Sequence, residues 1–239
     1  MDRINIMNIS TTLIDYSKVF FVIPAFNEEG VVDRVISEIQ QKGPQIVVVD
    51  DCSTDDTYER CVNSGAGVVR HSVTLGQGAA LQTGISFALK HSAEIIVTFD
   101  SDGQHRVQDA MKMIETLVSE ELDVLLGSRF LGVRPVGMPK ERLFLLKLAV
   151  IFTRLSSRVK VTDSHNGLRV MTRYAADTIN LTHNRMAHAS EILTQIHKKR
   201  LRYSEYPVQI VYTTATLRKG QRSSNLFSIL FELLMGRFR

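Results

Sequence analysis

Two aspartates stand one residue apart at the end of an apolar segment, in the sequence TFDSDGQH at residues 98–105. Side chains at positions i and i+2 of an extended chain project to the same side, so the carboxylates of Asp100 and Asp102 converge. Their repulsion is costly unless a cation lies between them. Mg²⁺ and Mn²⁺ typically bind one or two carboxylates together with substrate phosphates, and Gln104 offers a further carbonyl oxygen. The alternative is a solvated loop whose acids cap the following helix, because a bare D-x-D is common by chance.

A second acidic pair and a proline-containing turn follow two other apolar segments. Asp50 and Asp51 end the segment QIVVVDD, where a carboxylate can accept a hydrogen bond from a nucleobase imide or a ribose hydroxyl. In IPAFNE, Pro24 stiffens the turn, and Ala25 and Phe26 suit the wall of a flat base pocket. Helix capping in the first case and ordinary turn chemistry in the second are the alternatives.

The segment LGQGAALQTG, residues 75–84, places glycines before an expected helix and so can expose backbone N–H groups to a phosphate. It lacks the Gly-Lys-Ser/Thr ending of a P-loop and the G-x-G-x-x-G spacing of a dinucleotide site. Close approach of the backbone to a nucleotide and tight helix packing both remain explanations of these glycines.

These segments must be positioned by strands and helices, which alternate through the first half of the chain. The β-branched apolar segments are typical of strands buried on both faces. Asn27 is the expected cap of the first helix, and Ser53 or Thr54 that of the second. The alternation predicts an α/β fold with a mainly parallel sheet flanked by helices, whose ligands bind beyond the carboxyl ends of the strands. The expected strands are residues 19–26, 45–51, 67–71, 94–100 and 123–129, and the expected helices are residues 27–43, 52–65, 76–92 and 106–121.

The second half of the chain is less regular. Residues 140–160 predict a long, largely apolar helix, residues 187–200 an amphipathic helix, and residues 203–213 a strand. The tail at residues 223–239 predicts a short amphipathic helix that ends in arginines.

Composition and charge set the broad class. The 239 residues, 44% hydrophobic and 23% charged, suit one globular domain, and two cysteines without a pairing pattern suit a reducing cytosol. We expect neither a signal peptide nor a membrane-spanning segment. Residues 1–128 hold 9 basic and 19 acidic side chains, a net charge of −10, whereas residues 129–239 hold 20 and 6, a net charge of +14. This asymmetry favours an anionic partner for the second half: phosphate, nucleic acid or a membrane surface.

Seven segments, in this order, resemble those of family 2 glycosyltransferases, above all the branch of dolichyl-phosphate mannose synthase and polyprenyl-phosphate glucosyltransferases. The resemblance extends over about residues 18–215, and the ordered series is far more specific than any single segment. It implies a GT-A (Rossmann-like) fold, a nucleotide-diphosphate sugar donor, Mg²⁺ or Mn²⁺, and inversion at the anomeric carbon. The segments are VIPAFNEEGVV, VVVDDCSTDDT, GQGAALQTGI, FDSDGQH, GSRF, DSHNGLRVMTR and SEILTQIHKKRLRYSEYPV.

Carried over to this chain, the resemblance assigns donor binding, metal binding and catalysis to particular residues. Asp51 is the implied base contact, and Asp102 is the implied main metal ligand, with Asp100 and Gln104 beside it. Arg129 of GSRF would reach the phosphates or the acceptor. The full donor-binding set comprises Pro24, Ala25, Phe26, Glu28, Asp51, Gln77, Asp100, Ser101, Arg169 and Arg218.

Glu191 of SEIL matches an acid beside the acceptor site of the family and is the candidate general base. With a hydroxyl acceptor, this carboxylate would remove the hydroxyl proton in a single displacement. A lipid phosphate is already anionic, and Glu191 would then position the donor or the acceptor. A solvated or salt-bridged helix residue is the alternative. The segment DSHNGLR departs from the Ser-Gly-Phe-Arg of the branch at His165, Asn166 and Leu168, which leaves the acceptor type open, whereas Arg169 matches the family arginine.

The basic residues of the second half favour a location at a membrane surface. Residues 129–160 hold eight basic side chains and one acid among apolar residues, and basic amphipathic helices lie at anionic bilayer surfaces. We expect a catalytic domain at residues 1–215, then a basic loop and an amphipathic C-terminal helix at residues 216–239. The expected location is the cytoplasmic face of the membrane, and the expected acceptor is a polyprenyl phosphate or a lipid-linked glycan. A buried helix and a homodimer contact are the alternatives for the apolar segments.

Two other functions stay open on the sequence alone. A nucleotidyltransferase usually has a glycine-rich basic loop after its first strand, which IPAFNEEG lacks. A non-catalytic, membrane-peripheral scaffold would have no need of an intact D-x-D, Asp51 and Glu191. Nucleic-acid binding is not expected, because no platform of aromatic side chains accompanies the basic residues.

Overall fold

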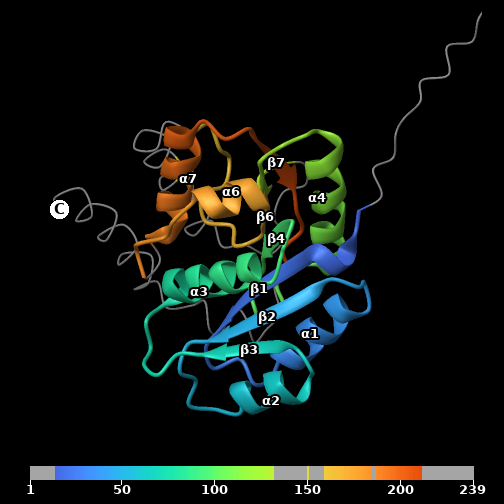
Figure 1. The fold of residues 1–239 in the computed structure, drawn as a ribbon, viewed down its shortest axis with the longest axis vertical. Helices are drawn as coiled ribbons and strands as arrows, with labels where there is room; N and C mark the ends of the chain where they lie inside the picture. The colour runs from blue at the N-terminus through green and yellow to red at the C-terminus, as the bar shows by residue number, and fades with distance from the viewer. Residues whose placement is uncertain (1–13, 132–149, 151–158, 185–186, 212–239) are drawn as a thin grey trace, which may run out of the picture.

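The computed structural model describes residues 14–131, 150, 159–184 and 187–211. Within them, seven strands form one sheet in the order β3-β2-β1-β4-β6-β5-β7 (Figure 1). β6 is antiparallel to its neighbours β4 and β5, and the other neighbouring pairs are parallel. The strands are β1 (Val19–Ala25), β2 (Gln45–Asp50), β3 (Gly67–Arg70), β4 (Ile95–Thr98), β5 (Val124–Ser128), β6 (Arg169–Thr172) and β7 (Tyr203–Pro207).

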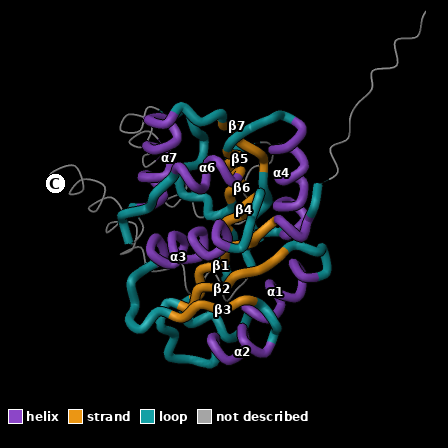
Figure 2. Tube along the Cα trace, viewed as in Figure 1, coloured by secondary structure: helices purple, strands orange, loops and turns teal. Residues whose placement is uncertain are grey.

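Helices cover both faces of this sheet, as Figure 2 shows. One apolar core lies between the sheet and α1, α2 and α4, and a second lies between the sheet and α3, α6 and α7. The two cores give the layered architecture of an open α/β fold. The helices are α1 (Val32–Gln40), α2 (Thr57–Asn63), α3 (Gln77–Lys90), α4 (Val107–Ser119), α6 (Arg173–Thr178) and α7 (His188–Lys199), and the 3₁₀ turn η1 (Tyr16–Lys18) precedes β1.

The central strands follow directly from the sequence. All seven residues of β1 are buried, as are the last five of β2, which agrees with their continuous apolar runs. In α1, the buried residues are Val32, Val35, Ile36 and Ile39, the stripe that the helical period predicts. The predicted fold class, a mainly parallel sheet flanked by helices, is therefore confirmed.

Both predicted helix caps are wrong. Asn27 stands before α1 with φ of 55°, and its side-chain oxygen accepts from the backbone N–H of Thr54 at 2.9 Å instead of capping the helix. Ser53 and Thr54 precede α2 by several residues, and the carboxylate of Asp55 accepts from the backbone N–H of Thr57 at 3.0 Å. The polar residues after β1 and β2 thus bind each other, and this joins the two loops at the carboxyl edge of the sheet.

Two elements of the second half, β6 and the short helix α6 that follows it, have no counterpart in the sequence predictions. β6 has four residues and begins with the buried Arg169, so neither its length nor its composition signals a strand. Its antiparallel insertion between β4 and β5 brings the preceding segment, residues 163–168, to the carboxyl end of β4.

Several predictions concern segments outside the described residues. These are Arg218, the basic loop and C-terminal helix of residues 216–239, and most of the helix expected at residues 140–160. Among the helices that the structure describes, none is long and apolar enough to cross a membrane.

Candidate active site

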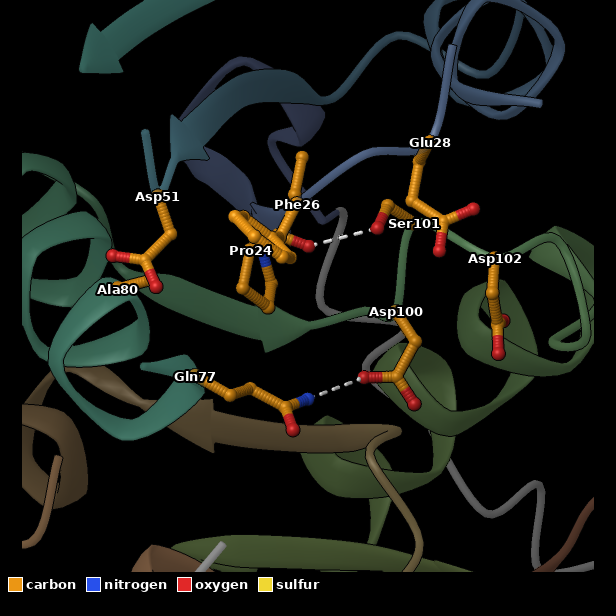
Figure 3. Close-up of a pocket in the computed structure, with 10 residues that line it drawn as sticks. Pro24, Phe26, Glu28, Asp51, Gln77, Ala80, Asp100, Ser101 and Asp102 are labelled. Atoms are coloured by element: carbon orange, nitrogen blue, oxygen red, sulfur yellow. Dashed lines mark hydrogen bonds between the residues drawn. The ribbon is translucent and has the colours of Figure 1, made fainter. Parts of the chain in front are cut away.

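A pocket opens where β1, β2 and β4 end, the edge at which parallel sheets bind ligands (Figure 3). It spans about 700 Å³, part of which is open to solvent. Nine of its ten lining residues belong to the sets predicted from the sequence, and the tenth, Ala80, lies three residues after Gln77 on the same face of α3. The nine are Pro24, Ala25, Phe26, Glu28, Asp51, Gln77, Asp100, Ser101 and Asp102.

Asp100 lies two residues after β4, and its carboxylate has a fixed orientation. Gln77 Nε2 donates to Oδ1 at 3.0 Å, as Figure 3 shows, and His105 Nε2 lies 3.1 Å from Oδ2. Burial alone would raise the pKa of Asp100, but the hydrogen bond and charge of His105, with the charge of Arg169, hold that pKa below its ordinary value. Asp100 is therefore an ionised carboxylate held between two donors.

Gly167 makes this position of Asp100 possible. A Cβ atom at residue 167 would overlap both carboxylate oxygens of Asp100. The hydroxyl of Thr98 donates to the carbonyl oxygen of Gly167 at 2.7 Å and fixes the glycine against the end of β4. No local sequence pattern marks this glycine, because its contact with Asp100 exists only once β6 is paired with β4.

Asp102 experiences the repulsion expected of two neighbouring acids. Its Oδ1 accepts from the backbone N–H of Gln104 at 3.0 Å. Burial raises the pKa of Asp102 to about 6, and the charges of Asp100 and Glu28 add to the rise. A positive charge placed beside Asp102 would consequently be stabilising.

The two carboxylates fit a divalent cation that the protein shares with a ligand. Asp100 and Asp102 line the same pocket, and both offer the hard oxygen donors that Mg²⁺ and Mn²⁺ prefer. Within the described residues, no three His, Cys, Asp or Glu side chains gather to hold a metal ion. The donor set therefore suits an ion completed by substrate phosphates, with Gln104 as a further candidate ligand.

Asp51 lines the pocket, and its carboxylate already accepts three hydrogen bonds. The backbone N–H groups of Leu75 and Gly76 donate to it at 2.9 and 2.7 Å, and His71 Nδ1 lies 2.7 Å from Oδ1. Asp51 thus holds the loop between β3 and α3, and any base contact would add to these bonds. His71, which also contacts Thr83 at 3.0 Å, was not predicted, although it directly follows β3 and so obeys the same strand-end rule.

The wall opposite α3 comes from the end of β1. Ser101 Oγ donates to the carbonyl oxygen of Pro24 at 2.9 Å, which joins the loop after β4 to β1 (Figure 3). The side chain of Phe26 is 46% exposed at the rim. An exposed aromatic ring at the rim of a pocket is suited to stacking on a flat base.

Arg129 and Arg169 do not line this pocket. Arg129 forms a bidentate pair with the buried Asp163, with Nε and Nη2 donating at 2.6 and 2.8 Å. Arg169 is 3% exposed, and its Nη1 has no hydrogen-bond partner among the residues that the structure describes. Burial lowers the pKa of His165 to about 4, so the imidazole of His165 is neutral at pH 7. Their predicted contacts with phosphates or acceptor stay predictions.

The first turn of α3 is capped by backbone instead of being open to a ligand. The carbonyl oxygen of Asn184 accepts from the N–H groups of Gly78 and Ala79 at 2.7 and 3.2 Å. A Cβ atom at residue 78 would overlap the carbonyl oxygen of His183. The glycine here serves close packing, one of the two explanations left open by the sequence, and these two N–H groups are not free for a phosphate.

Glu191 lies in the first turn of α7 and is not among the residues that line the pocket. Its carboxylate accepts from the backbone N–H groups of Thr182 and His183, each at 3.0 Å, and from Thr182 Oγ1 at 2.6 Å. Burial alone would raise the pKa of Glu191, but the hydrogen bonds from Thr182 and His183 outweigh it and lower that pKa. The role of general base stays a prediction.

A mostly parallel sheet with a carboxylate-lined pocket at the ends of its first strands is the arrangement expected of the GT-A fold. The chain belongs to glycosyl transferase family 2, whose family model matches residues 20–180. Family membership confirms the resemblance predicted from the sequence and identifies the chain as a glycosyltransferase, in place of the nucleotidyltransferase or scaffold considered above.

The similar proteins include two from archaea and one from a bacterium. An uncharacterized protein of Methanocaldococcus jannaschii is 37% identical over 227 residues, covering 93% of each chain. The UDP-N-acetylglucosamine–dolichyl-phosphate N-acetylglucosaminyltransferase of Methanococcus voltae is 30% identical over 239 residues, covering 91% of this chain and 95% of the relative. The glucosyl-3-phosphoglycerate synthase of Mycobacterium tuberculosis, solved with Mn²⁺, UDP and glucosyl-3-phosphoglycerate, has a TM-score of 0.65 at 18% identity, over 91% of this chain and 80% of the other. This last similarity shows the shared fold.

Proposed function

We propose that the chain transfers a sugar from a nucleotide-diphosphate sugar to a polyprenyl phosphate, with inversion at the anomeric carbon and with Mg²⁺ or Mn²⁺ bound at Asp100 and Asp102. The observation that carries the proposal is the pocket itself. An exposed aromatic ring, that of Phe26, and the carboxylates of Asp100 and Asp102 line it together at one edge of the sheet. The relative from Methanococcus voltae is similar to this chain over nearly its whole length. Its name specifies a UDP-sugar donor and a dolichyl-phosphate acceptor, which supports the same classes of substrate here.

Different residues of the pocket suit the nucleoside and the diphosphate of the donor. Phe26 and Asp51 suit the nucleoside, one by stacking and the other by accepting a hydrogen bond. Asp100 and Asp102 hold the diphosphate end through the divalent ion, which neutralises charge on the leaving nucleoside diphosphate when bound. Gln77 and His105 orient Asp100, and the hydrogen bond and charge of His105 offset the effect of burial and favour its ionised form.

A phosphate acceptor simplifies the chemistry asked of the protein. Its oxygen is already anionic and attacks the anomeric carbon from the face opposite the leaving group, so no side chain has to remove a proton. With a hydroxyl acceptor, such as a lipid-linked glycan, a general base would be required. The basic second half of the chain suits a peripheral position on the cytoplasmic face of a membrane, where a polyprenyl phosphate is presented.

A transfer assay tests the proposal. Purified protein is incubated with dolichyl phosphate and radiolabelled UDP-N-acetylglucosamine, UDP-glucose or GDP-mannose, with Mn²⁺, Mg²⁺ or EDTA. We expect a labelled lipid with at least one donor, its loss in EDTA, and its loss in Asp102→Asn while the fold is retained. Equal transfer in EDTA, or transfer to water and glycans only, would contradict the proposal.

A further inference from the structure

Glu191 is connected to the pocket through a short backbone segment, residues 180–184, which is hydrogen-bonded to both α3 and α7. Four consecutive N–H groups of this segment, from residue 180 to residue 183, donate to side chains. Gln195 accepts the first at 2.9 Å, Gln82 of α3 accepts the second at 2.7 Å, and Glu191 accepts the last two. The segment is thereby fixed to both helices.

Glu191 contributes the charged part of this attachment. Its carboxylate is 11% exposed, and both of its oxygens accept from Thr182 and His183. Hydrogen bonds to an ionised acceptor are shorter and stronger than those between neutral groups. A carboxylate with these bonds has a weakened capacity to remove a proton, because its ionised form is the one that the surroundings stabilise.

The other end of the segment meets the start of α3. The carbonyl oxygen of Asn184 caps the helix through the N–H groups of Gly78 and Ala79, where the N-cap residue Gly76 supplies no side chain. Gly78 also packs against His188 of α7, since a Cβ there would lie 3.0 Å from the Cβ of His188. The position of the first turn of α3 therefore depends on the segment.

That first turn carries the amide that orients Asp100. Gln77 is the first residue of α3, directly before the two capped N–H groups, and its Nε2 donates to Asp100 Oδ1 at 3.0 Å. The path from Glu191 to Asp100 runs through three sets of hydrogen bonds, which are joined by the backbone of residues 182–184 and by the first turn of α3.

From this arrangement we infer that Glu191 is a positioning residue for the transfer reaction: it fixes residues 180–184, which set the first turn of α3 and so the hydrogen bond from Gln77 to Asp100. It does not act as the general base. The inference rests on the proposed function for the identity of the reaction that is measured, and a substrate-free measurement separates the two.

The substrate-free measurement is amide hydrogen exchange at Gly78 and Ala79. In Glu191→Gln, the amide NH₂ faces backbone N–H donors and the charge is lost, so the attachment of the segment weakens. We expect these two amides to exchange at least about ten-fold faster than in the wild type. Glu59→Gln is the matched control, because Glu59 lies in the first turn of α2 and is exposed, and exchange at both amides should not change. Unchanged exchange in Glu191→Gln overturns the inference.

A double-mutant cycle on kcat tests the route through Gln77. Gln77→Ala removes one hydrogen bond to a charged group and is expected to lower kcat roughly 10- to 100-fold. If Glu191 acts through Gln77, adding Glu191→Gln lowers kcat by no more than about three-fold further, because the two effects are coupled. Losses that multiply would overturn the inference.

Rescue by formate completes the test, since formate can replace a missing base but cannot hold residues 180–184 in place. Glu191→Ala should stay unrescued, and its pH profile of kcat should keep the shape of the wild-type profile. Recovery of activity in formate would establish a base and contradict the positioning role. Should the wild type transfer no sugar to dolichyl phosphate, the proposed function fails, and exchange at Gly78 and Ala79 alone decides the inference.

Discussion

Replacing Asp102 with asparagine is expected to stabilise the metal-free protein at neutral pH. The carboxyl pKa is about 6 in the folded chain and 3.8 ordinarily, so between these pH values the folded protein keeps a proton that the unfolded chain has lost. The stability of the wild type therefore falls as the pH rises through this window, and the loss is complete above pH 6. At about 1.36 kcal/mol for each pH unit, the loss reaches about 3 kcal/mol, and a neutral amide avoids it.

Urea unfolding in EDTA at pH 7.5 and pH 4 measures this effect. Asp102→Asn should exceed the wild type by up to about 3 kcal/mol at pH 7.5, and the difference should shrink to below about 1 kcal/mol at pH 4. Asp100→Asn is the control, and its free energy of unfolding at pH 7.5 should be lower than that of the wild type. The reason is that the pKa of Asp100 is held below its ordinary value, so its ionised form is stabilised. If Asp102→Asn is no more stable than the wild type at pH 7.5, the claim that this charge is unfavourable is refuted.

Three further predictions concern contacts around the site and in the core. Gly167→Ala should lower kcat about 100-fold by displacing Asp100, with little change in far-UV circular dichroism, and wild-type turnover would contradict the close contact. Arg129→Ala should lower the free energy of unfolding by about 3–5 kcal/mol, because it leaves Asp163 buried and unpaired, and Asp163→Asn in the same chain should restore part of it. Burial raises the pKa of the Cys61 thiol to about 12, so iodoacetamide should not modify Cys61 at pH 7.5 until urea unfolds the chain; rapid native-state modification would show that the site is open.

The sequence predicted the pocket well because one rule applied to several segments. Polar residues that follow buried parallel strands meet at one edge of the sheet, and this placed Asp51, Asp100 and Asp102 together before any contact was known. The residues of IPAF followed from the same rule. Gln77 was predicted from the glycine-containing segment at residues 75–84. The physical reason for the glycine at residue 78 is its close packing against residue 183.

What the sequence did not predict depends on contacts between distant segments. Asn27 has the composition of a helix cap, yet it binds the backbone of Thr54, because the loops after β1 and β2 lie side by side. Arg129 has its partner 34 residues away, in Asp163, and no local pattern marks that pair. Glu191 likewise binds residues 182 and 183 through a contact between a helix and a segment of irregular backbone.

Helix and strand patterns were informative where elements are long and buried, and uninformative where they are short. β6 has four residues and follows a polar segment, so its antiparallel position between β4 and β5 arises only from the completed sheet. That strand nevertheless brings Gly167 to Asp100, and a part of the site is therefore set by an element with no sequence signal.

Everything proposed for the reaction requires that Asp100 and Asp102 hold a divalent cation together with the diphosphate of the donor. Crystals of the protein soaked with UDP and Mn²⁺ test it most directly through the anomalous scattering of manganese. We expect one strong anomalous peak within about 2.0–2.6 Å of a carboxylate oxygen and of a diphosphate oxygen, with the base beside Phe26. Bound UDP with both carboxylates turned away from it, or manganese elsewhere in the molecule, would contradict the claim.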